Sequence, residues 1–182
     1  MHITIGENRL ELTIGDITKE TTAAIVNAAN GSLMGGGGVD GAIHQAAGPE
    51  LLQACRKVRK EQLKGESLGT GEVVITAGYN LPANYVIHTV GPIWDPHQPN
   101  QDKQLANCYQ NALKLATAHH LSSIAFPSIS TGVYRFPLET AAEIAIKTIT
   151  NYLQTTHFGH VKMVLFTEDD FRVYQSALNQ YN

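Results

Sequence analysis

Apolar and polar positions along this 182-residue chain follow two different periods, one typical of strands and one typical of helices. Residues 10–14 alternate between apolar and polar side chains, which predicts a strand. Residues 23–28 form an almost continuous apolar run, as in strands that are buried on both faces of a sheet. Similar short runs predict four more strands, at residues 73–76, 85–90, 123–126 and 161–166.

Apolar residues at helical spacing fill the segments between these strands. A first helix is expected over residues 39–47, and a second begins at Pro49, since proline favours the first helical turn. Thr167 with Asp170 forms a helix-start signature before the last helix. The later helices are expected around residues 105–116, 138–153 and 171–181. This alternation predicts an α/β fold with helices on both faces of a largely parallel sheet, and the early hairpin-like strands make the sheet mixed.

Composition is consistent with one globular domain spanning residues 1–182, because 43% of the residues are hydrophobic and 16% are charged. The first residues lack the pattern of a signal peptide, and no apolar run approaches the roughly 20 residues of a membrane span. Cys55 and Cys108 fall on apolar helix faces, which is typical of reduced core cysteines. We therefore expect a cytoplasmic protein with no membrane partner.

Charge and metal-ligand patterns limit the ligands that this chain is expected to hold. The net charge of −3 gives no electrostatic basis for nucleic acid as the main partner. A basic cluster at residues 56–60 is consistent with a polyanion contact, but a solvated helix face is the simpler interpretation. The eight histidines show no zinc spacing and there is no C-x-x-C. We expect no metal and no cofactor.

A glycine-rich stretch at residues 27–41, N-A-A-N-G-S-L-M-G-G-G-G-V-D-G, is the most informative part of the chain. Consecutive glycines let a backbone approach a ligand closely or adopt positive φ. Because they run into a predicted helix N-terminus, they indicate a phosphate site built from backbone N–H groups. A flexible surface loop is the alternative, although Leu33, Met34 and Val39 give this stretch apolar flanks. Residues 36–41 also fit G-x-G-x-x-G, which as a dinucleotide fingerprint is weak here because two helices precede the next strand.

Three informative segments follow predicted strands: Asp16, the glycine-rich stretch, and residues 128–137. In open α/β sheets, ligands bind beyond the carboxyl ends of the strands. We therefore expect these segments to converge on one cleft.

These motifs together resemble the macrodomain family, most closely its MacroD-type branch, whose bacterial members remove ADP-ribose or acetyl groups. The resemblance covers roughly residues 10–178 and implies a three-layer α/β/α sandwich that binds ADP-ribose in a cleft. Five segments carry it: G-D-I-T at 15–18, I-V-N-A-A-N at 25–30, G-G-G-G-V-D-G-A-I-H at 35–44, H-T-V-G-P-I-W at 88–94 and F-P-S-I-S-T-G-V-Y at 126–134.

The resemblance implies a role for each matching residue. Asp16 would accept a hydrogen bond from the adenine amino group, beside the Ile17 backbone, although a helix cap is the alternative. Phe171 would stack on adenine or pack in the core, and these two interpretations stay open. The remaining implied ligand contacts, to the diphosphate and the distal ribose, come from Asn27, Gly35, Gly36, Gly37, Gly38, Val39, Ser130, Thr131, Gly132, Val133, Tyr134 and Phe136.

The resemblance also implies two catalytic residues, Asn30 and Asp40. Asn30 would hydrogen-bond the hydroxyls of the distal ribose. Asp40 would orient or deprotonate the attacking water, or leave that activation to a ligand phosphate oxygen and hold ribose and solvent in line. The alternatives are a turn residue for Asn30 and a helix cap for Asp40. Arg135 departs from the family pattern, because many relatives carry glycine after the loop tyrosine.

The resemblance therefore predicts a hydrolase that binds ADP-ribose and cleaves ADP-ribosyl esters with water. Its expected partners are O-acetyl-ADP-ribose and proteins that carry mono-ADP-ribose on acidic residues, and ADP-ribosylated nucleic-acid ends stay open as substrates. A non-enzymatic ADP-ribose reader is the main alternative. A nicotinamide-dependent oxidoreductase is a further alternative, which depends only on the G-x-G-x-x-G match. A single-stranded RNA binder is another, which depends only on the basic cluster.

Overall fold

The computed structural model describes residues 1–182, and a seven-stranded sheet forms its centre, in the order β1-β2-β7-β6-β3-β5-β4. The strands are β1 (His2–Ile5), β2 (Asn8–Ile14), β3 (Ala24–Ala28), β4 (Val73–Ala77), β5 (Tyr85–Thr89), β6 (Ser123–Phe126) and β7 (His160–Leu165). The five inner strands run parallel, while β1 and β4 are antiparallel edge strands. The predicted mixed, largely parallel sheet is confirmed. Its antiparallel pairs are β1–β2 and β4–β5, however, whereas the two early strands predicted at residues 10–14 and 23–28 are separated by β7 and β6.

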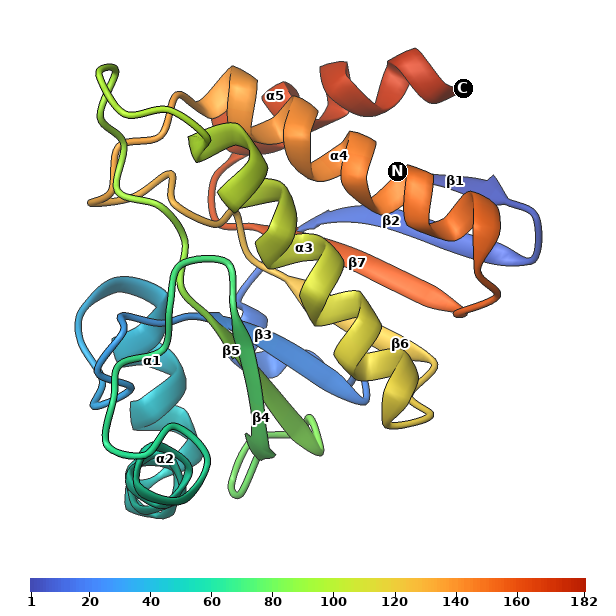
Figure 1. Cartoon of the computed structure of the whole chain (residues 1–182). Helices are drawn as coiled ribbons and strands as arrows, with labels where there is room; N and C mark the ends of the chain where they lie inside the picture. The colour runs from blue at the N-terminus through green and yellow to red at the C-terminus, as the bar shows by residue number, and fades with distance from the viewer.

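Five α-helices cover both faces of the sheet. They are α1 (Gly38–Ala47), α2 (Pro49–Glu61), α3 (Gln101–Ala118), α4 (Leu138–Thr155) and α5 (Glu168–Leu178). A cluster of 29 buried residues joins α3, α4 and α5 to one face, and a cluster of 17 joins α1 and α2 to the other. The molecule is therefore a three-layer α/β/α sandwich, with α3 beside α4 and α1 with α2 grouped apart from them (Figure 1). None of its helices combines the length and the apolar character needed to cross a membrane.

The predicted helix-start signals lie where helices begin. The hydroxyl of Thr167 accepts a hydrogen bond from the Asp170 N–H at 3.1 Å and caps α5, while Pro49 occupies the first turn of α2. At its other end, α5 stops at Leu178, and residues 179–181 continue as a short 3-10 helix rather than as the predicted α-helix. Both cysteines are free and buried, as predicted.

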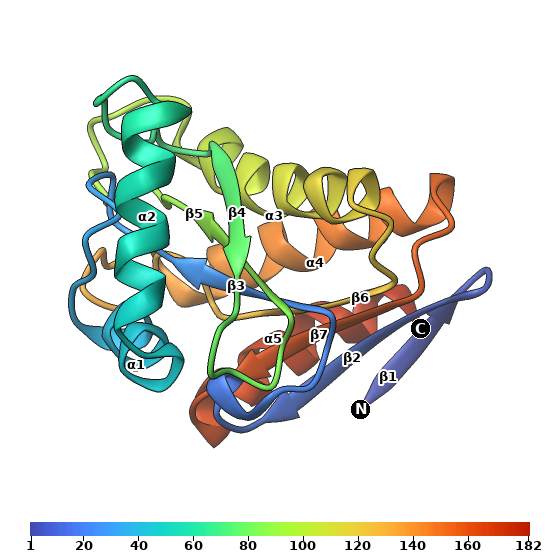
Figure 2. The ribbon, with the colours of Figure 1, turned by 90° about the horizontal axis from the view of Figure 1, so that it is seen from below.

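The prediction missed β1 and began β2 two residues late. The two strands form an antiparallel pair in which Ile5 faces Asn8 across a tight turn. Asn8 is polar but buried, because Leu153 and Thr156 carbonyls accept from its amide nitrogen and Phe158 and Gly159 amides donate to its oxygen. Those partners come from the far end of the sequence, so the local pattern of residue types does not reveal them. Figure 2 shows this hairpin at one end of the sheet and β4 with α2 at the other.

Candidate active site

The carboxyl ends of the five parallel strands open into one cleft of about 780 Å³. This position follows the rule for ligand sites in open α/β sheets. The cleft is lined by residues that follow these strands and by the start of α1: Gly15, Asp16, Ile17, Ala28, Ala29, Asn30, Gly36, Gly37, Gly38, Val39, Asp40, Ala42, Gly91, Pro127, Ser128, Ile129, Ser130, Thr131, Gly132, Val133, Tyr134, Val164, Phe166 and Asp170. The expected convergence of the glycine-rich stretch with the segment after β6 is therefore present.

The glycine wall of the cleft leads directly into α1. Gly35 and Gly38 have φ values of +87° and +58°, in the left-handed region that favours glycine. Gly37 is the N-cap of α1 and has no side chain to satisfy the first N–H groups of the helix. Those N–H groups and the positive end of the helix dipole therefore line the cleft, which favours an anionic ligand.

Asp40 lies in the first turn of α1, with only 5% of the residue exposed. Its two carboxylate oxygens have different surroundings. Oδ1 accepts a hydrogen bond from Asn27 Nδ2 at 2.9 Å and lies 3.5 Å from His44 Nε2. Oδ2 faces Gly36, where an added Cβ atom would lie 3.2 Å from it. One oxygen is therefore held by the protein, while the other is directed toward the cleft wall.

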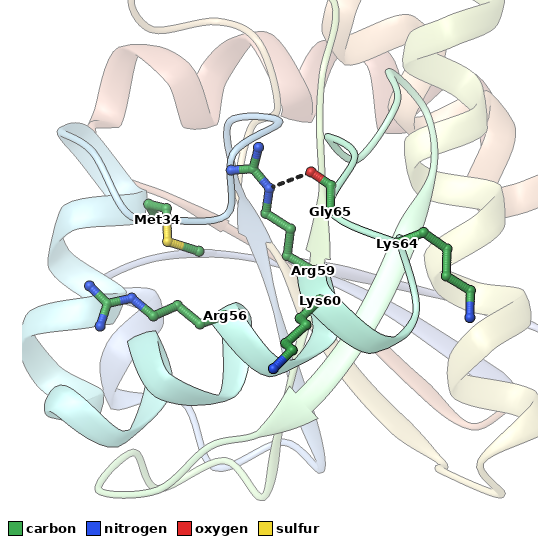
Figure 3. A pocket seen from close by; sticks show the side chains of 6 residues that line it. All are labelled: Met34, Arg56, Arg59, Lys60, Lys64 and Gly65. Atoms are coloured by element: carbon green, nitrogen blue, oxygen red, sulfur yellow. Dashed lines mark hydrogen bonds between the residues drawn. The ribbon is translucent and has the colours of Figure 1, made fainter.

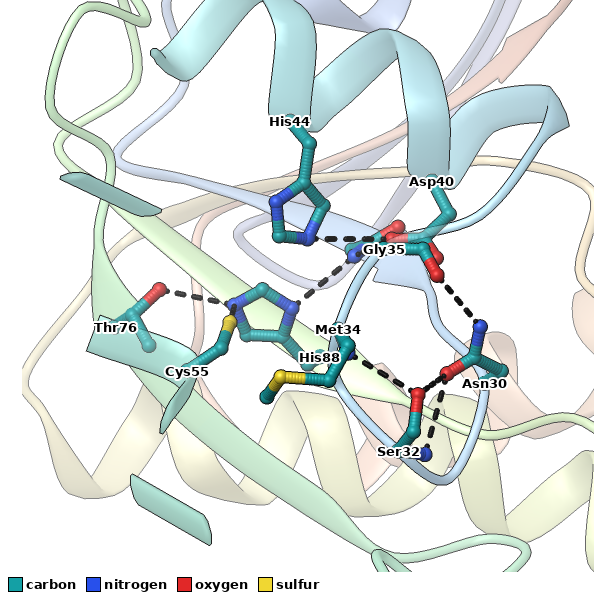
Figure 4. Close-up of polar contacts among 10 residues, drawn as sticks. Asn30, Ser32, Met34, Gly35, Asp40, His44, Cys55, Thr76 and His88 are labelled. Atoms are coloured by element: carbon teal, nitrogen blue, oxygen red, sulfur yellow. Dashed lines mark hydrogen bonds and ion pairs between the residues drawn. The ribbon is translucent and has the colours of Figure 1, made fainter. Parts of the chain in front are cut away.

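Asn30 follows β3 and also approaches Gly36. Its Nδ2 donates to the Gly35 carbonyl at 2.9 Å, and its Oδ1 accepts from the Ser32 N–H at 3.2 Å and the Ser32 hydroxyl at 2.5 Å (Figure 4). A Cβ atom at Gly36 would also lie 3.2 Å from Asn30 Nδ2. An amide donor and a carboxylate acceptor thus converge at Gly36, and only glycine leaves the space between them open.

Asp16 lies at another part of the cleft and serves as the N-cap of the 3-10 helix Ile17–Lys19. Its Oδ1 accepts from the Thr18 hydroxyl at 2.7 Å and the Thr18 N–H at 2.9 Å, and these bonds lower the pKa of Asp16. Since only Oδ1 is used, Oδ2 of this exposed side chain is available as an acceptor for a ligand. Capping and lining the cleft are therefore compatible roles.

The loop between β6 and α4 is held from beneath by two buried tyrosines. The Tyr174 hydroxyl lies 2.7 Å from Ser128 Oγ, and the Tyr109 hydroxyl accepts from the Ile129 N–H at 3.1 Å. The Thr131 hydroxyl donates to Ser128 Oγ at 2.8 Å. Burial raises the pKa of Tyr174 to about 12, so this hydroxyl keeps its proton at neutral pH. These hydrogen bonds therefore hold the first part of the loop, residues 128–131, against the core.

Four of the residues named from the sequence lie outside the lining. Asn27 is buried beneath Asp40, with 1% exposed, and Gly35 lies behind the wall with its carbonyl on Asn30. Phe136 is buried against Trp94, with ring centroids 4.9 Å apart. Phe171 is half-buried and packs against the core. The structure brings the other thirteen together in the cleft: Asp16, Ile17, Asn30, Gly36, Gly37, Gly38, Val39, Asp40, Ser130, Thr131, Gly132, Val133 and Tyr134.

Phe166 is a lining residue that sequence reasoning missed. It follows β7 directly and is 85% exposed, which is unusual for a large aromatic side chain. Its position at the carboxyl end of an inner parallel strand is the feature from which a lining role could have been predicted. Arg135, the departure from the family pattern, is exposed and holds φ at +58°, the conformation that glycine adopts without strain.

The basic cluster of α2 borders a separate open hollow of about 580 Å³, which shares no residue with the cleft. Figure 3 shows its lining: Met34, Arg56, Arg59, Lys60, Lys64 and Gly65. Arg59 donates to the Ser32 carbonyl at 3.2 Å and the Gly65 carbonyl at 3.3 Å. Arg59 therefore ties the loop after β3 to the end of α2, while Arg56 and Lys60 are exposed.

Comparison with known proteins identifies the family. The Macro domain family model matches residues 26–145, the segment that runs from β3 into α4. The chain belongs to the macrodomain family. An O-acetyl-ADP-ribose deacetylase of Escherichia fergusonii is 53% identical over 176 residues, which cover 96% of this chain and 97% of that protein.

Solved macrodomains have the same architecture. A macrodomain of Oceanobacillus iheyensis, solved with ADP, is 58% identical, has a TM-score of 0.98, and is matched over 100% of this chain and 95% of that one. A Trypanosoma brucei macrodomain in complex with ADP-ribose is 39% identical with a TM-score of 0.84, and the match covers 93% of this chain and 68% of that one. The resemblance inferred from the motifs is confirmed.

Proposed function

We propose that this macrodomain binds ADP-ribose in its cleft and hydrolyses ADP-ribosyl esters. The observation that carries the proposal is the convergence of Asp40 Oδ2 and Asn30 Nδ2 at Gly36, in a cleft whose wall is a helix N-terminus. A carboxylate and an amide at one point suit a ribose with several hydroxyls, and the helix N-terminus suits a diphosphate. The names of the deacetylase relatives and the ADP and ADP-ribose complexes of solved relatives support this proposal.

The groups along the cleft indicate where each part of ADP-ribose would lie. Adenine would lie near Asp16 and Phe166, where an unused carboxylate oxygen and an exposed aromatic ring are available. The diphosphate would lie between the start of α1 and the β6–α4 loop, both of which offer backbone N–H groups. The distal ribose would then reach Asn30 and Asp40.

The reaction is ester hydrolysis by water. Water adds to the ester carbonyl, the bond from the acyl carbon to the ribose oxygen breaks, and the products are ADP-ribose and a carboxylic acid. Asp40 Oδ2 holds the water and takes its proton, which then passes to the departing ribose oxygen. Asn30 fixes the ribose hydroxyls so that the ester faces this water.

Two ester substrates are proposed, O-acetyl-ADP-ribose and a protein that carries mono-ADP-ribose on a glutamate or aspartate. Both place an acyl group on the distal ribose, where the cleft presents Asn30 and Asp40. We further place the protein in the cytoplasm, since both of its cysteines are buried free thiols, as is common in reducing compartments.

Asp40→Ala tests the chemistry. We expect turnover of O-acetyl-ADP-ribose, followed by mass spectrometry, to fall by about 10²- to 10⁴-fold, the usual contribution of a general base. The affinity for ADP-ribose, measured by calorimetry, should change only a few-fold. Asp102→Ala is the matched control, because Asp102 also lies in the first turn of a helix but on the other face of the sheet.

The same assay with a carboxyl-linked ADP-ribosyl protein, run side by side, tests the second substrate. Unchanged turnover in Asp40→Ala would remove Asp40 from the mechanism. ADP-ribose binding by the wild-type protein with no product from either ester would instead indicate a reader of ADP-ribose.

A further inference from the structure

Three polar side chains continue from Asp40 into the interior, on the side away from the cleft. Asn27, His88 and Thr76 come from β3, β5 and β4, and they are 1%, 0% and 7% exposed. Asn27 and His88 are partners in the strand register. Period-two alternation places all three on the sheet face that α1 and α2 cover. Nothing in the hydrolysis described above uses His88 or Thr76.

The hydrogen bonds among these side chains form one continuous chain. Thr76 Oγ1 lies 2.9 Å from His88 Nε2, and His88 Nδ1 lies 3.1 Å from Asn27 Nδ2. The same Asn27 nitrogen donates to Asp40 Oδ1 at 2.9 Å. Figure 4 shows His88 between Thr76 on one side and the Asp40 carboxylate on the other.

Donor and acceptor rules fix the protons along this chain. An amide nitrogen only donates and a carboxylate only accepts, so Asn27 uses both of its N–H groups, one for Asp40 and one for His88. His88 Nδ1 must therefore accept, which places the imidazole proton on Nε2 and directs it to Thr76. Burial lowers the pKa of His88 to about 3, so the ring stays neutral and Nδ1 keeps its lone pair at neutral pH.

The Asn27 amide is oriented with its nitrogen toward Asp40 and His88 and its oxygen away from them. This orientation leaves the oxygen unpaired, but the reversed orientation would be less favourable. Asn27 Oδ1 is buried and has no hydrogen-bond partner. A buried oxygen without a donor is unfavourable, yet the reversed amide would point this oxygen at the Asp40 carboxylate and at the His88 lone pair. The Asp40 carboxylate and the Nδ1 lone pair of His88 therefore favour the same orientation, in which the Asn27 amide nitrogen faces both of them.

We propose that His88 is a positioning residue, which orients the Asn27 amide through its Nε2–H tautomer and thereby aims the Asp40 carboxylate at the cleft. The inference rests on the proposed function, since it assigns Asp40 to the reaction. Without the Asn27 bond, only His44 would hold Oδ1, at 3.5 Å. The carboxylate could then rotate, and Oδ2 would lose its fixed direction toward Gly36.

A pair of amide substitutions separates positioning from packing. In His88→Asn, the side-chain oxygen can occupy the place of Nδ1 and accept from Asn27. In His88→Gln, the amide reaches the place of Nε2 instead, near Thr76, and leaves Asn27 without its acceptor. Both variants replace a buried ring by an amide, so we expect both thermal midpoints to fall by a similar amount.

We expect kcat for O-acetyl-ADP-ribose to fall by about 10- to 100-fold in His88→Gln, because small misplacements of a reacting group are costly. His88→Asn should keep most of the wild-type kcat. KM and the calorimetric Kd for ADP-ribose should change only a few-fold in both variants. Equal losses of kcat in the two variants, or no loss in either, would overturn the proposal.

The tautomer can be measured without any substrate. In the wild-type protein labelled with ¹⁵N-histidine, imidazole nitrogen shifts should show His88 neutral and protonated on Nε2. A proton on Nδ1 would overturn the proposed chain even if the enzyme is active. If the wild-type protein hydrolyses neither ester, the proposed function fails. In that case an Nε2–H tautomer would still support the orientation of the Asn27 amide, but His88 would have no positioning role in catalysis.

Discussion

Phe166 and Phe171 both lie near the end of β7, but their surroundings differ. Phe166 is 85% exposed and lines the cleft near Asp16, whereas Phe171 is half-buried against the core. The sequence left two interpretations of Phe171 open, adenine stacking and core packing. Its contacts favour core packing, and Phe166 is the exposed ring that we propose for adenine stacking.

Truncation of each ring separates these roles. We expect Phe166→Ala to weaken ADP-ribose binding by about 1–3 kcal/mol, the usual contribution of an aromatic ring stacked on a base. Phe171→Ala should leave binding almost unchanged but lower the free energy of unfolding by roughly 1–3 kcal/mol, since its packing is partial. Calorimetry and urea unfolding of both variants measure these effects. The reverse assignment would require Phe171→Ala to weaken binding in a protein that remains stably folded.

At the scale of single elements, the β6–α4 loop is the part of the site that depends most on distant residues. Its sequence predicts a polar loop with a glycine, and the resemblance predicts that it binds the diphosphate. Neither shows that Ser128 and Ile129 are hydrogen-bonded by Tyr174 and Tyr109, which come from α5 and α3. Both tyrosines occupy apolar positions in the helical pattern of the sequence. That pattern does not indicate which group the tyrosine hydroxyl will hydrogen-bond.

Removal of the Tyr174 hydroxyl tests the support of the β6–α4 loop. In Tyr174→Phe, Ser128 loses one partner but keeps its hydrogen bond from Thr131, so we expect the free energy of unfolding to fall by about 0.5–1.5 kcal/mol. The affinity for ADP-ribose should also fall, because the diphosphate loop loses its support. Tyr152→Phe is the matched control, since the Tyr152 hydroxyl bonds Thr117 at 2.7 Å between α4 and α3, away from the cleft. If both variants lose affinity equally, the loop is not held through Tyr174.

At the scale of the whole molecule, the sequence predicts the layers better than the polar interior. Hydrophobic period and turn residues predict all five inner strands and the position of the cleft, because these depend on local patterns and on a general rule for α/β sheets. The edge strand β1 and the buried Asn8 escape prediction, since their partners lie far away in the sequence. His88 likewise appears in the family motif H-T-V-G-P-I-W, but only coordinates show that Asn27 and Thr76 are its partners.

The buried His88 also affects how the stability of the whole protein depends on pH. Its pKa is about 3 in the folded protein, while a histidine in an unfolded chain has a pKa of about 6.5. Between these values the unfolded chain binds a proton that the folded protein does not. The stabilisation is therefore complete above about pH 6.5 and is lost as pH falls toward 3, by up to about 1.4 kcal/mol per pH unit.

Comparison with His88→Asn isolates this effect, because the variant removes one titrating group and leaves the other carboxyls and histidines in place. Between about pH 7 and pH 5.5, the wild-type protein should lose about 1.2 kcal/mol more of its free energy of unfolding than the variant does. Urea unfolding at both pH values measures the difference. Equal losses would mean that His88 can take up a proton in the folded protein. A protonated ring would also have no lone pair for Asn27, so the same titration tests whether the interior that supports Asp40 stays neutral.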